Sequence, residues 1–275
     1  MIDLKETTFI IPVTIESDDR LRNAKSVLGY LNHHFNTNVI IHEFTKDVSK
    51  LNFIEKLNNL KIEHIVEVNS LTDYHRTRQL NQMLNMVNTP VVVNYDIDVV
   101  LPVNSYVTAQ ERILSNNSDF VYPYGHGRFQ KQVLENFSRT VFDTNFNINS
   151  IDDIFWKIHN SEFGHCFFAN TEKYILAGGE NEDFVAYGPE DAERAYRFKK
   201  LGFSISRIDD FVYHFEHSRT SFSSNTNARF YQNHEVFDKI LKMNDSEFLD
   251  YYKNPEYTKK YNKFYKRNLN GNNKS

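Results

Sequence analysis

The sequence predicts an α/β fold with a mostly parallel central sheet, flanking helices and a helical C-terminal extension. Short apolar, β-branched segments alternate with amphipathic segments of helical periodicity along most of the chain. Residues 8–13, which are apolar after Thr8, and residues 91–93 form consecutive apolar runs typical of strands buried on both faces of a parallel sheet. Because parallel strands need crossover connections, the intervening segments are expected to be helices packed on the sheet.

The elements are expected in the following order. Asp18 and Asp19 are candidate caps for a helix over about residues 20–35, whose apolar positions share one face. Pro189 suits the first position of another helix, and Gly202 suits its C′ position. The remaining expected strands are 38–41, 62–68, 91–95, 119–122, 166–169, 204–208 and 211–215, and the remaining helices are 51–60, 80–87, 107–114, 171–177 and 189–201. Residues 123–162 are expected to form loops and short helices.

Composition limits the possible functions. The 275 residues are 40% hydrophobic and 15% aromatic, enough for a sizeable core. A formal charge of −4 argues against general nucleic-acid binding. Cys166 is the single cysteine, so no internal disulfide can form. The first residues do not resemble a signal peptide, and no apolar run approaches the ~20 residues that span a bilayer. A soluble cytoplasmic protein is therefore expected.

An Asp-x-Asp sequence follows the strand at residues 91–95. Asp96 and Asp98 stand where this apolar strand ends, and the carboxyl ends of strands are where α/β sheets bind ligands. Carboxylate oxygens there suit Mg²⁺ or Mn²⁺, with the ion also bound by substrate phosphates. The alternative is a solvated loop after a strand.

Two further segments carry candidate chemistry. Glu190 and Asp191 occupy the first turn of the helix after Pro189, where one carboxylate could accept a proton from a substrate hydroxyl. Acidic residues in a first turn are also ordinary helix caps. His214 and His217 could converge on one ion if the chain turns between them, or could be surface residues.

A third segment precedes the helix that leads into the Asp-x-Asp strand. Tyr74 could stack on a planar base, and Arg76 could hold a phosphate or a base edge. The alternative is a basic helix start beside a core tyrosine.

Five motifs in this order resemble the metal-dependent GT-A glycosyltransferases, most of all the β-1,4-galactosyltransferase group and the polypeptide N-acetylgalactosaminyltransferases. The resemblance covers about residues 9–220. It rests on the Ile-Pro strand at 11–12, the aromatic-x-Arg segment at 74–76, the Asp-x-Asp motif at 96–98, Gly-x-Glu-Asp at 188–191 and His-Ser-Arg at 217–219. It implies a catalytic domain over residues 1–222, with a nucleotide-sugar half (about 1–122) and an acceptor and metal half (about 123–222), before the helical extension 223–275.

The resemblance also implies residue roles. Asp98, His214 and His217 would be metal ligands, and a histidine at 214, where galactosyltransferases often have methionine, would suit Mn²⁺ and tolerate Mg²⁺. Asp191 would be the catalytic base, and Glu190 would hold the acceptor. The implied contacts to the UDP-sugar donor come from Pro12, Val13, Thr14, Glu16, Tyr74, Arg76, Asp96, Ile97 and Gly164.

The resemblance predicts transfer of Gal or GalNAc, with inversion, from a UDP-sugar to a hydroxyl of a saccharide acceptor in surface polysaccharide or glycoconjugate synthesis. Three departures bear on the sugar and the acceptor. Thr14-Ile15-Glu16 replaces an Arg-x-Arg sequence, Tyr187 replaces a tryptophan of the acceptor site, and Gly164-His165 replaces a Gly-Gly pair. Alternative functions are a metal-dependent nucleotidyltransferase or sugar-nucleotide hydrolase, and a sugar-nucleotide-binding protein without transferase activity.

The C-terminal tail has two interpretations. Residues 251–274 combine seven Lys and Arg residues with tyrosines and phenylalanine. Such a surface could contact an anionic membrane weakly at the inner face. Alternatively, it is a solvated terminal helix with its tyrosines packed on the domain.

Overall fold

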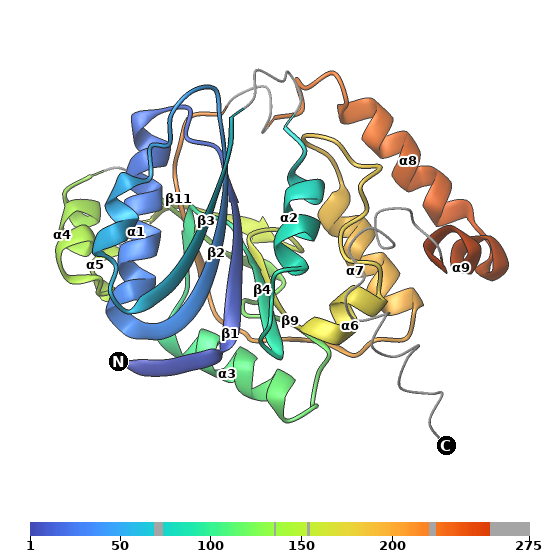
Figure 1. Cartoon of the computed structure of the whole chain (residues 1–275), viewed down its shortest axis with the longest axis horizontal. Helices are drawn as coiled ribbons and strands as arrows, with labels where there is room; N and C mark the ends of the chain where they lie inside the picture. Colours follow the sequence, from blue (N-terminus) through green and yellow to red (C-terminus); the bar gives the residue numbers. More distant parts are fainter. Residues whose placement is uncertain (69–73, 135, 153–154, 220–223, 254–275) are drawn as a thin grey trace.

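A seven-stranded sheet forms the centre of the molecule in the computed structural model of the chain (Figure 1). The structure describes residues 1–68, 74–134, 136–152, 155–219 and 224–253. In spatial order the strands are β10 (Ile205–Arg207), β6 (Phe120–Tyr122), β9 (Cys166–Asn170), β4 (Val91–Tyr95), β1 (Ile2–Val13), β2 (Phe35–Thr45) and β3 (Leu60–Val68). All neighbouring strands are parallel except β9, which is antiparallel to β4 and β6. The predicted α/β fold with a mostly parallel sheet is confirmed.

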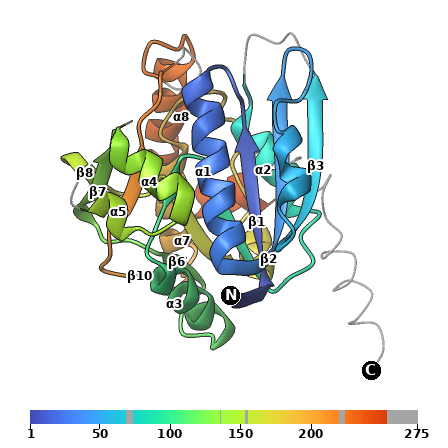
Figure 2. The same cartoon turned by 90° about the vertical axis from the view of Figure 1, so that its left-hand side faces the viewer.

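Helices cover both faces of this sheet (Figures 1 and 2). One face is covered by α1 (Asp18–His34) and α3 (Val103–Leu114), and the other by α2 (Arg76–Leu84), α6 (Thr171–Leu176) and α7 (Glu190–Lys200). Tyr106 of α3 packs against Phe9 and Phe168 on one face, and Phe198 of α7 stacks on Phe120 on the other. Since every residue of β4 is buried, its carboxyl end delivers Asp96 and Asp98 from a rigid strand.

A smaller four-stranded sheet corrects the expectation for residues 123–162. Its spatial order is β5 (Val99–Val100), β11 (Val212–Phe215), β7 (Gly127–Val133) and β8 (Phe155–Ser161). Only α4 (Phe137–Asn145) and α5 (Asn149–Asp152) agree with the predicted short helices. The expectation was wrong for β7 and β8 because β7 is polar and is held by pairing with β11, which is distant in sequence.

Three local predictions also need correction. The helix expected over 51–60 is one 3₁₀ turn, η1 (Asn52–Lys56), because Leu60 pairs with Thr37 and so begins β3. Ser17, not Asp18 or Asp19, is the N-cap residue of α1. Pro189 occupies the N-cap of α7 and not its first helical position, whereas Gly202 has the expected positive φ of 83° after the helix.

Two C-terminal helices pack on α7. They are α8 (Phe230–Lys242) and α9 (Asp245–Lys253), and their apolar residues form a small second core that includes Phe184 and Ile240. The helical part of the predicted extension is therefore observed to residue 253. Tyr252 packs on the domain, with Arg197 5.1 Å from its ring centre, while the basic stretch 254–275 lies outside the described residues. Among the helices described, none combines the length and apolar character needed to cross a bilayer.

Candidate functional site

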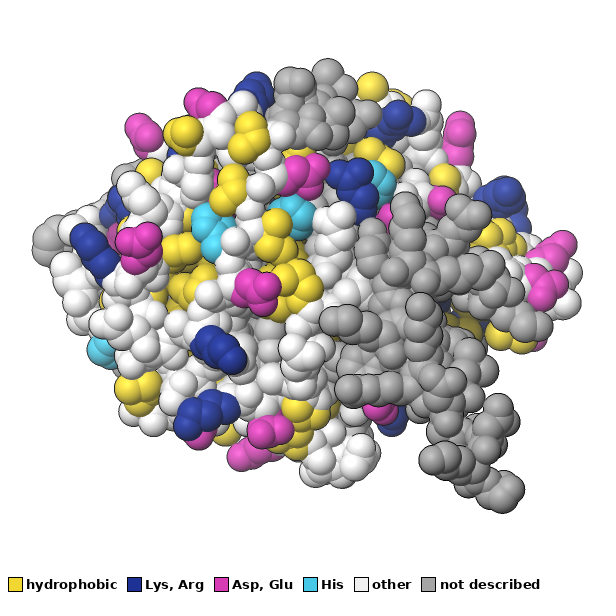
Figure 3. Space-filling model, viewed as in Figure 1, with side chains coloured by type: hydrophobic (Ala, Val, Ile, Leu, Met, Phe, Trp, Pro, Cys, Tyr) yellow, Lys and Arg dark blue, Asp and Glu magenta, His cyan; other side chains and the backbone are white. Residues whose placement is uncertain are grey.

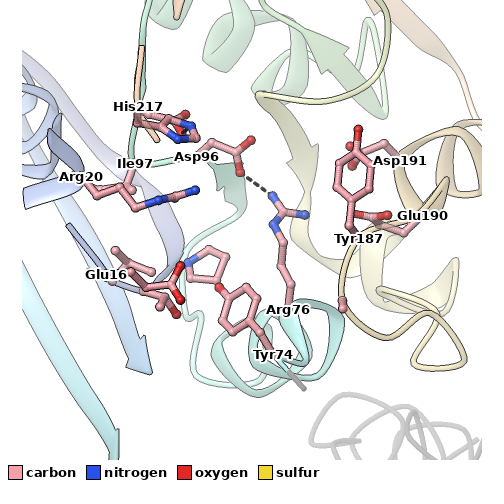
Figure 4. Close-up of a pocket in the computed structure, with 15 residues that line it drawn as sticks. Glu16, Arg20, Tyr74, Arg76, Asp96, Ile97, Tyr187, Glu190, Asp191 and His217 are labelled. Carbon is pink, nitrogen blue, oxygen red and sulfur yellow. Dashed lines mark hydrogen bonds and ion pairs between the residues drawn. The ribbon is translucent and has the colours of Figure 1, made fainter. Parts of the chain in front are cut away.

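An open cleft lies at the carboxyl ends of β1 and β4 (Figure 4). In the view of Figure 3, basic, acidic and histidine side chains lie together in the upper middle part of the face, near these strand ends. Most of the predicted site residues line the cleft: Pro12, Val13, Thr14, Glu16, Tyr74, Arg76, Asp96, Ile97, Asp98, Glu190, Asp191 and His217. His214 and Gly164 are not part of its lining, but each contacts a residue that is.

The Asp-x-Asp turn is fixed by buried contacts. Asp96 N–H donates to the carbonyl oxygen of His165 at 2.9 Å, and Tyr95 OH donates to the carbonyl oxygen of Val99 at 2.8 Å. The next two residues of the chain after Asp98 form β5, which pairs with β11 so that Val99 lies opposite His214. This pairing of strands over 110 positions apart in sequence brings an imidazole to Asp98.

Asp98, His214 and His217 form a compact cluster. One potential ligand atom from each lies within 4.8 Å of the other two. His217 Nε2 is 3.0 Å from Asp98 Oδ2, and His214 Nε2 is 3.9 Å from the same oxygen. The structure therefore brings together the three predicted metal ligands.

The second nitrogen of each imidazole is held by an oxygen. His214 Nδ1 lies 3.0 Å from Oε1 of Gln132 on β7, and His217 Nδ1 lies 2.9 Å from the carbonyl oxygen of Ser218. Because these oxygens can only accept, both Nδ1 atoms carry a proton. The Nε2 of the neutral His214 can then offer a lone pair, and the Nε2 of His217, which shares a proton with Asp98, could do so once that proton is displaced. This is the arrangement in which histidines bind metals in proteins.

Burial and charge agree with this arrangement. Burial lowers the pKa of His214 to about 3, which keeps its imidazole neutral. Burial alone would raise the pKa of Asp98, but the two imidazoles hold it well below its usual value. Burial lowers the pKa of His217, but the hydrogen bond to Asp98 and the negative charge of Asp98 together outweigh burial, so the pKa is raised overall. A cation bound here would replace the proton that His217 shares with Asp98. One carboxylate and two imidazoles form a donor set that could hold a divalent transition-metal ion, the class to which the predicted Mn²⁺ belongs.

The part of the cleft next to Asp96 contains a buried arginine. Arg76, in the first turn of α2, forms an ion pair with Asp96 and lies 3.4 Å from Asn94 Oδ1. Its Nη1 atom is buried and has no hydrogen-bond partner among the described residues, so it can donate to a ligand in the cleft. Burial raises the pKa of Asp96, and Arg76 opposes this shift. Tyr74 lines the same side, and its ring packs edge-on against Phe44.

The adjacent carboxylates Glu190 and Asp191 have different surroundings on the opposite side of the cleft (Figure 4). Burial, and then the charge of Asp191, raise the pKa of Glu190 to about 8, and its Oε2 has no hydrogen-bond partner among the described residues. Asp191 Oδ1 instead accepts from Arg194 Nη2 at 2.7 Å. Glu190 is thus mostly protonated at pH 7, while Asp191 has a paired positive charge.

Arg194 fixes the position of Asp191. Its Nη1 lies 3.0 Å from both carboxylate oxygens of Glu180, and its Nη2 also donates to the carbonyl oxygen of Phe163 at 3.1 Å. The side chains of Arg194 and Glu180 are 2% and 1% exposed, so this network is rigid. Gly164 lies behind Asp191, where a Cβ atom would stand 3.3 Å from Asp191 Oδ2.

Several residues of the site were not predicted. Arg20, in the first turn of α1, points into the cleft near His217 and Asp96 (Figure 4). An arginine beside Asp18 and Asp19 gives no signal of its own, because first-turn residues of a helix are usually polar. Gln132, Glu180 and Arg194 act through other site residues, and only the tertiary contacts identify them.

Comparisons with known proteins show that the fold is similar to that of solved structures. No family model matches the chain, and no curated protein matches its sequence. Among solved structures, S. aureus TarS residues 1–349 in complex with UDP-GlcNAc is similar over 90% of this chain and 72% of that one, with a TM-score of 0.55 and 14% identity. A second S. aureus TarS structure is similar over 90% of this chain but 43% of its own, with a TM-score of 0.54 and 15% identity. At these identities the likeness shows the fold alone, a mixed α/β fold with a central, mostly parallel sheet.

Proposed function

We propose that this chain is a metal-dependent, inverting glycosyltransferase that moves a sugar from a UDP-sugar to a hydroxyl of a saccharide acceptor. The observation that carries the proposal is the cluster of Asp98, His214 and His217 at the edge of a cleft that Glu190 and Asp191 line from the opposite side. The glycosyltransferase fold supports it, as does the UDP-GlcNAc complex of TarS.

The donor would lie between these two groups. Tyr74 offers a ring for the uracil, and Arg76 and Arg20 bring positive charge to the floor of the cleft. Arg20 points into the cleft near His217 and Asp96 (Figure 4), from where it could contact the diphosphate. A divalent cation held by the cluster would neutralise the charge that develops on the leaving diphosphate.

The carboxylate of Asp191 would act on the acceptor. It takes the proton of the attacking hydroxyl while the hydroxyl oxygen bonds to the anomeric carbon. The bond from that carbon to the β-phosphate oxygen breaks, and UDP leaves with the electron pair. Attack on the face opposite the leaving group inverts the anomeric configuration. Protonated Glu190 can donate a hydrogen bond to the acceptor beside this site.

A donor-panel assay tests the proposal. We expect purified protein with Mn²⁺ to release UDP from at least one of UDP-Gal, UDP-GalNAc and UDP-GlcNAc, faster with saccharide acceptors than without. The first two donors follow from the sequence resemblance, and the third from the TarS complex. Product NMR would report the anomeric configuration, and activity in Mg²⁺ would report metal tolerance.

The other outcomes separate the alternatives. Release of a sugar phosphate with UMP would indicate a hydrolase, and formation of a sugar-nucleotide from sugar phosphate and UTP would indicate a nucleotidyltransferase. Tight UDP-sugar binding without turnover of any donor would indicate a binding protein. Retention of configuration would contradict the role of Asp191. The proposal includes a cytoplasmic location, which fractionation of expressing cells would test.

A further inference from the structure

An aromatic cluster extends the acceptor side of the cleft onto α8. It consists of Tyr187, Phe230, Tyr231 and His234 and is called the rim platform below. The rings of Tyr187 and Phe230 are nearly parallel, with 13° between their planes and 5.9 Å between their centres. Phe230 also meets Tyr231 edge-on at 5.5 Å and His234 at 4.5 Å. Tyr187 therefore belongs both to the cleft lining and to this cluster.

The platform is held rigidly against the loop that precedes α7. Asn233 of α8 is buried, and its Nδ2 donates to the carbonyl oxygens of Val185 at 2.8 Å and Tyr187 at 3.0 Å. A Cβ atom at Gly188 would lie 2.7 Å from Asn233, so the glycine permits this close approach. The relative position of Tyr187 and α8 is thus set by buried hydrogen bonds and does not depend on the exposed rings.

The rings of the platform are accessible from outside. Tyr231 is 75% exposed and Tyr187 is 37% exposed, and the neighbouring Gln232 and His234 are also exposed. A tyrosine this exposed contributes little to the core, so its stability role is small. The surface combines flat ring faces with hydrogen-bonding side chains.

We propose that the rim platform binds the sugar units of the acceptor that follow the reacting one, so that the acceptor is an oligosaccharide or longer chain and not a single sugar. A pyranose ring presents C–H groups on a face and hydroxyls at its edge. The electron-rich face of an aromatic ring attracts such C–H groups, and Gln232 and His234 can bond the hydroxyls. This inference rests on the proposed function, because it takes the saccharide acceptor from there.

The rim platform is continuous with the cleft, and this favours the acceptor saccharide as the molecule that it binds. Tyr187 lines the cleft together with Asp191, the proposed base, and it stacks on Phe230 at the start of α8. A chain whose terminal hydroxyl reaches Asp191 can leave the cleft along Tyr187 and pass over the platform. A protein partner could bind the same surface without entering the cleft. A platform that binds no saccharide in the test would favour such a partner.

The test compares platform variants with a control on the same helix. Tyr231→Ala and Phe230→Ala remove platform rings. Leu241→Ala removes a side chain that is 45% exposed and lies ten residues along α8, about 15 Å away. An array of immobilised mono-, di- and trisaccharides, probed with the full chain without donor, measures binding alone. Acceptor KM and kcat are then measured with the array ligands that bind.

We expect wild type to bind trisaccharides better than monosaccharides, and Tyr231→Ala to lose most of that difference. Its acceptor KM should rise about tenfold, with a smaller change in kcat, while Leu241→Ala should behave as wild type. No preference for longer chains, or equal binding by Tyr231→Ala and wild type, would overturn the inference, as would an array without any bound saccharide. Should no donor be turned over while Tyr231→Ala still abolishes array binding, the proposed transferase fails and the platform stands as a saccharide-binding surface.

Discussion

The two sides of the cleft are built in different ways. On the proposed donor and metal side, strands position the acids and His214: β4 ends at Tyr95, directly before Asp96, and the pairing of β5 with β11 places His214 beside Asp98. On the acceptor side, a loop leads into α7 and is held by side chains. Ala186 has a φ of 60°, and its N–H donates to the carbonyl oxygen of Tyr74 at 3.0 Å. Asn233 donates to the carbonyl oxygen of Tyr187, the next residue of the loop.

The difference indicates which side of the cleft tolerates amino-acid substitutions. His214 lies on β11, which pairs with β5 and β7, and Asp98 directly precedes β5, so neither proposed ligand can shift without disturbing the four-stranded sheet. A residue such as Tyr187, on a loop and 37% exposed, can be replaced at little cost to the fold. In the sequence resemblance, Tyr187 corresponds to a tryptophan of the galactosyltransferases, and this expected departure would fall on the exposed loop. We therefore expect mutations on the donor side to remove activity, and mutations on the acceptor side to change which acceptor is used.

The largest expected effect is that of Asp98→Asn. The amide has no negative charge to hold a cation between two imidazoles, so turnover should fall by about 10³-fold or more. Mn²⁺ binding, followed by calorimetry, should be lost in parallel. Normal Mn²⁺ affinity in this variant would show that the cluster is not the metal site.

Asp191→Asn should lower kcat by about 10²-fold or more, because the amide cannot accept the proton of the acceptor hydroxyl. UDP affinity, measured by calorimetry with Mn²⁺, should remain close to that of wild type. The two variants together separate the sides of the cleft: Asp98→Asn should lose the donor, and Asp191→Asn only the chemical step. A nearly normal rate for Asp191→Asn would refute its assignment as the base.

Gln132→Ala should weaken Mn²⁺ binding by about 10–100-fold without removing a ligand, since the His214 imidazole loses the oxygen that orients it. Gln132→Glu is the matched control, because its carboxylate can still accept from Nδ1 and should retain affinity. Equal losses in both variants would mean that β7, and not the hydrogen bond, was disturbed.

The smallest expected effect is on stability and depends on pH. Between its usual pKa of 4.5 and its raised pKa of about 8, Glu190 keeps its proton in the folded protein and loses it in the unfolded chain. Stability therefore falls as pH rises through this window. Glu190→Gln removes this dependence and should raise Tm at pH 8 by about 2–4 °C for each kcal/mol gained, with no difference near pH 4. Thermal melts at both pH values measure it, and an equal Tm at pH 8 would contradict the raised pKa.

Most of the fold could be read from the sequence because its signals are local. The apolar runs of β1 and β4 identify buried strands wherever they pair, and Gly202 ends α7 by its own backbone conformation. The prediction failed at β7, whose residues are mostly polar, and at β8, which pairs with it. It also failed at residues 51–60, because Leu60 pairs within β3. These are places where pairing with distant segments decides the conformation.

The sequence by itself determined which chemical groups the protein has: two acids after a buried strand, two carboxylates at a helix start and two histidines three positions apart. The tertiary structure decided that Asp98, His214 and His217 meet, that Gln132 orients one imidazole, and that burial raises the pKa of Glu190 to about 8. The physical reason is that residue type and spacing are properties of the chain. Ligand convergence and the cost of burying a charge depend on what surrounds a group, and only the packing of the two sheets and α7 supplies those surroundings.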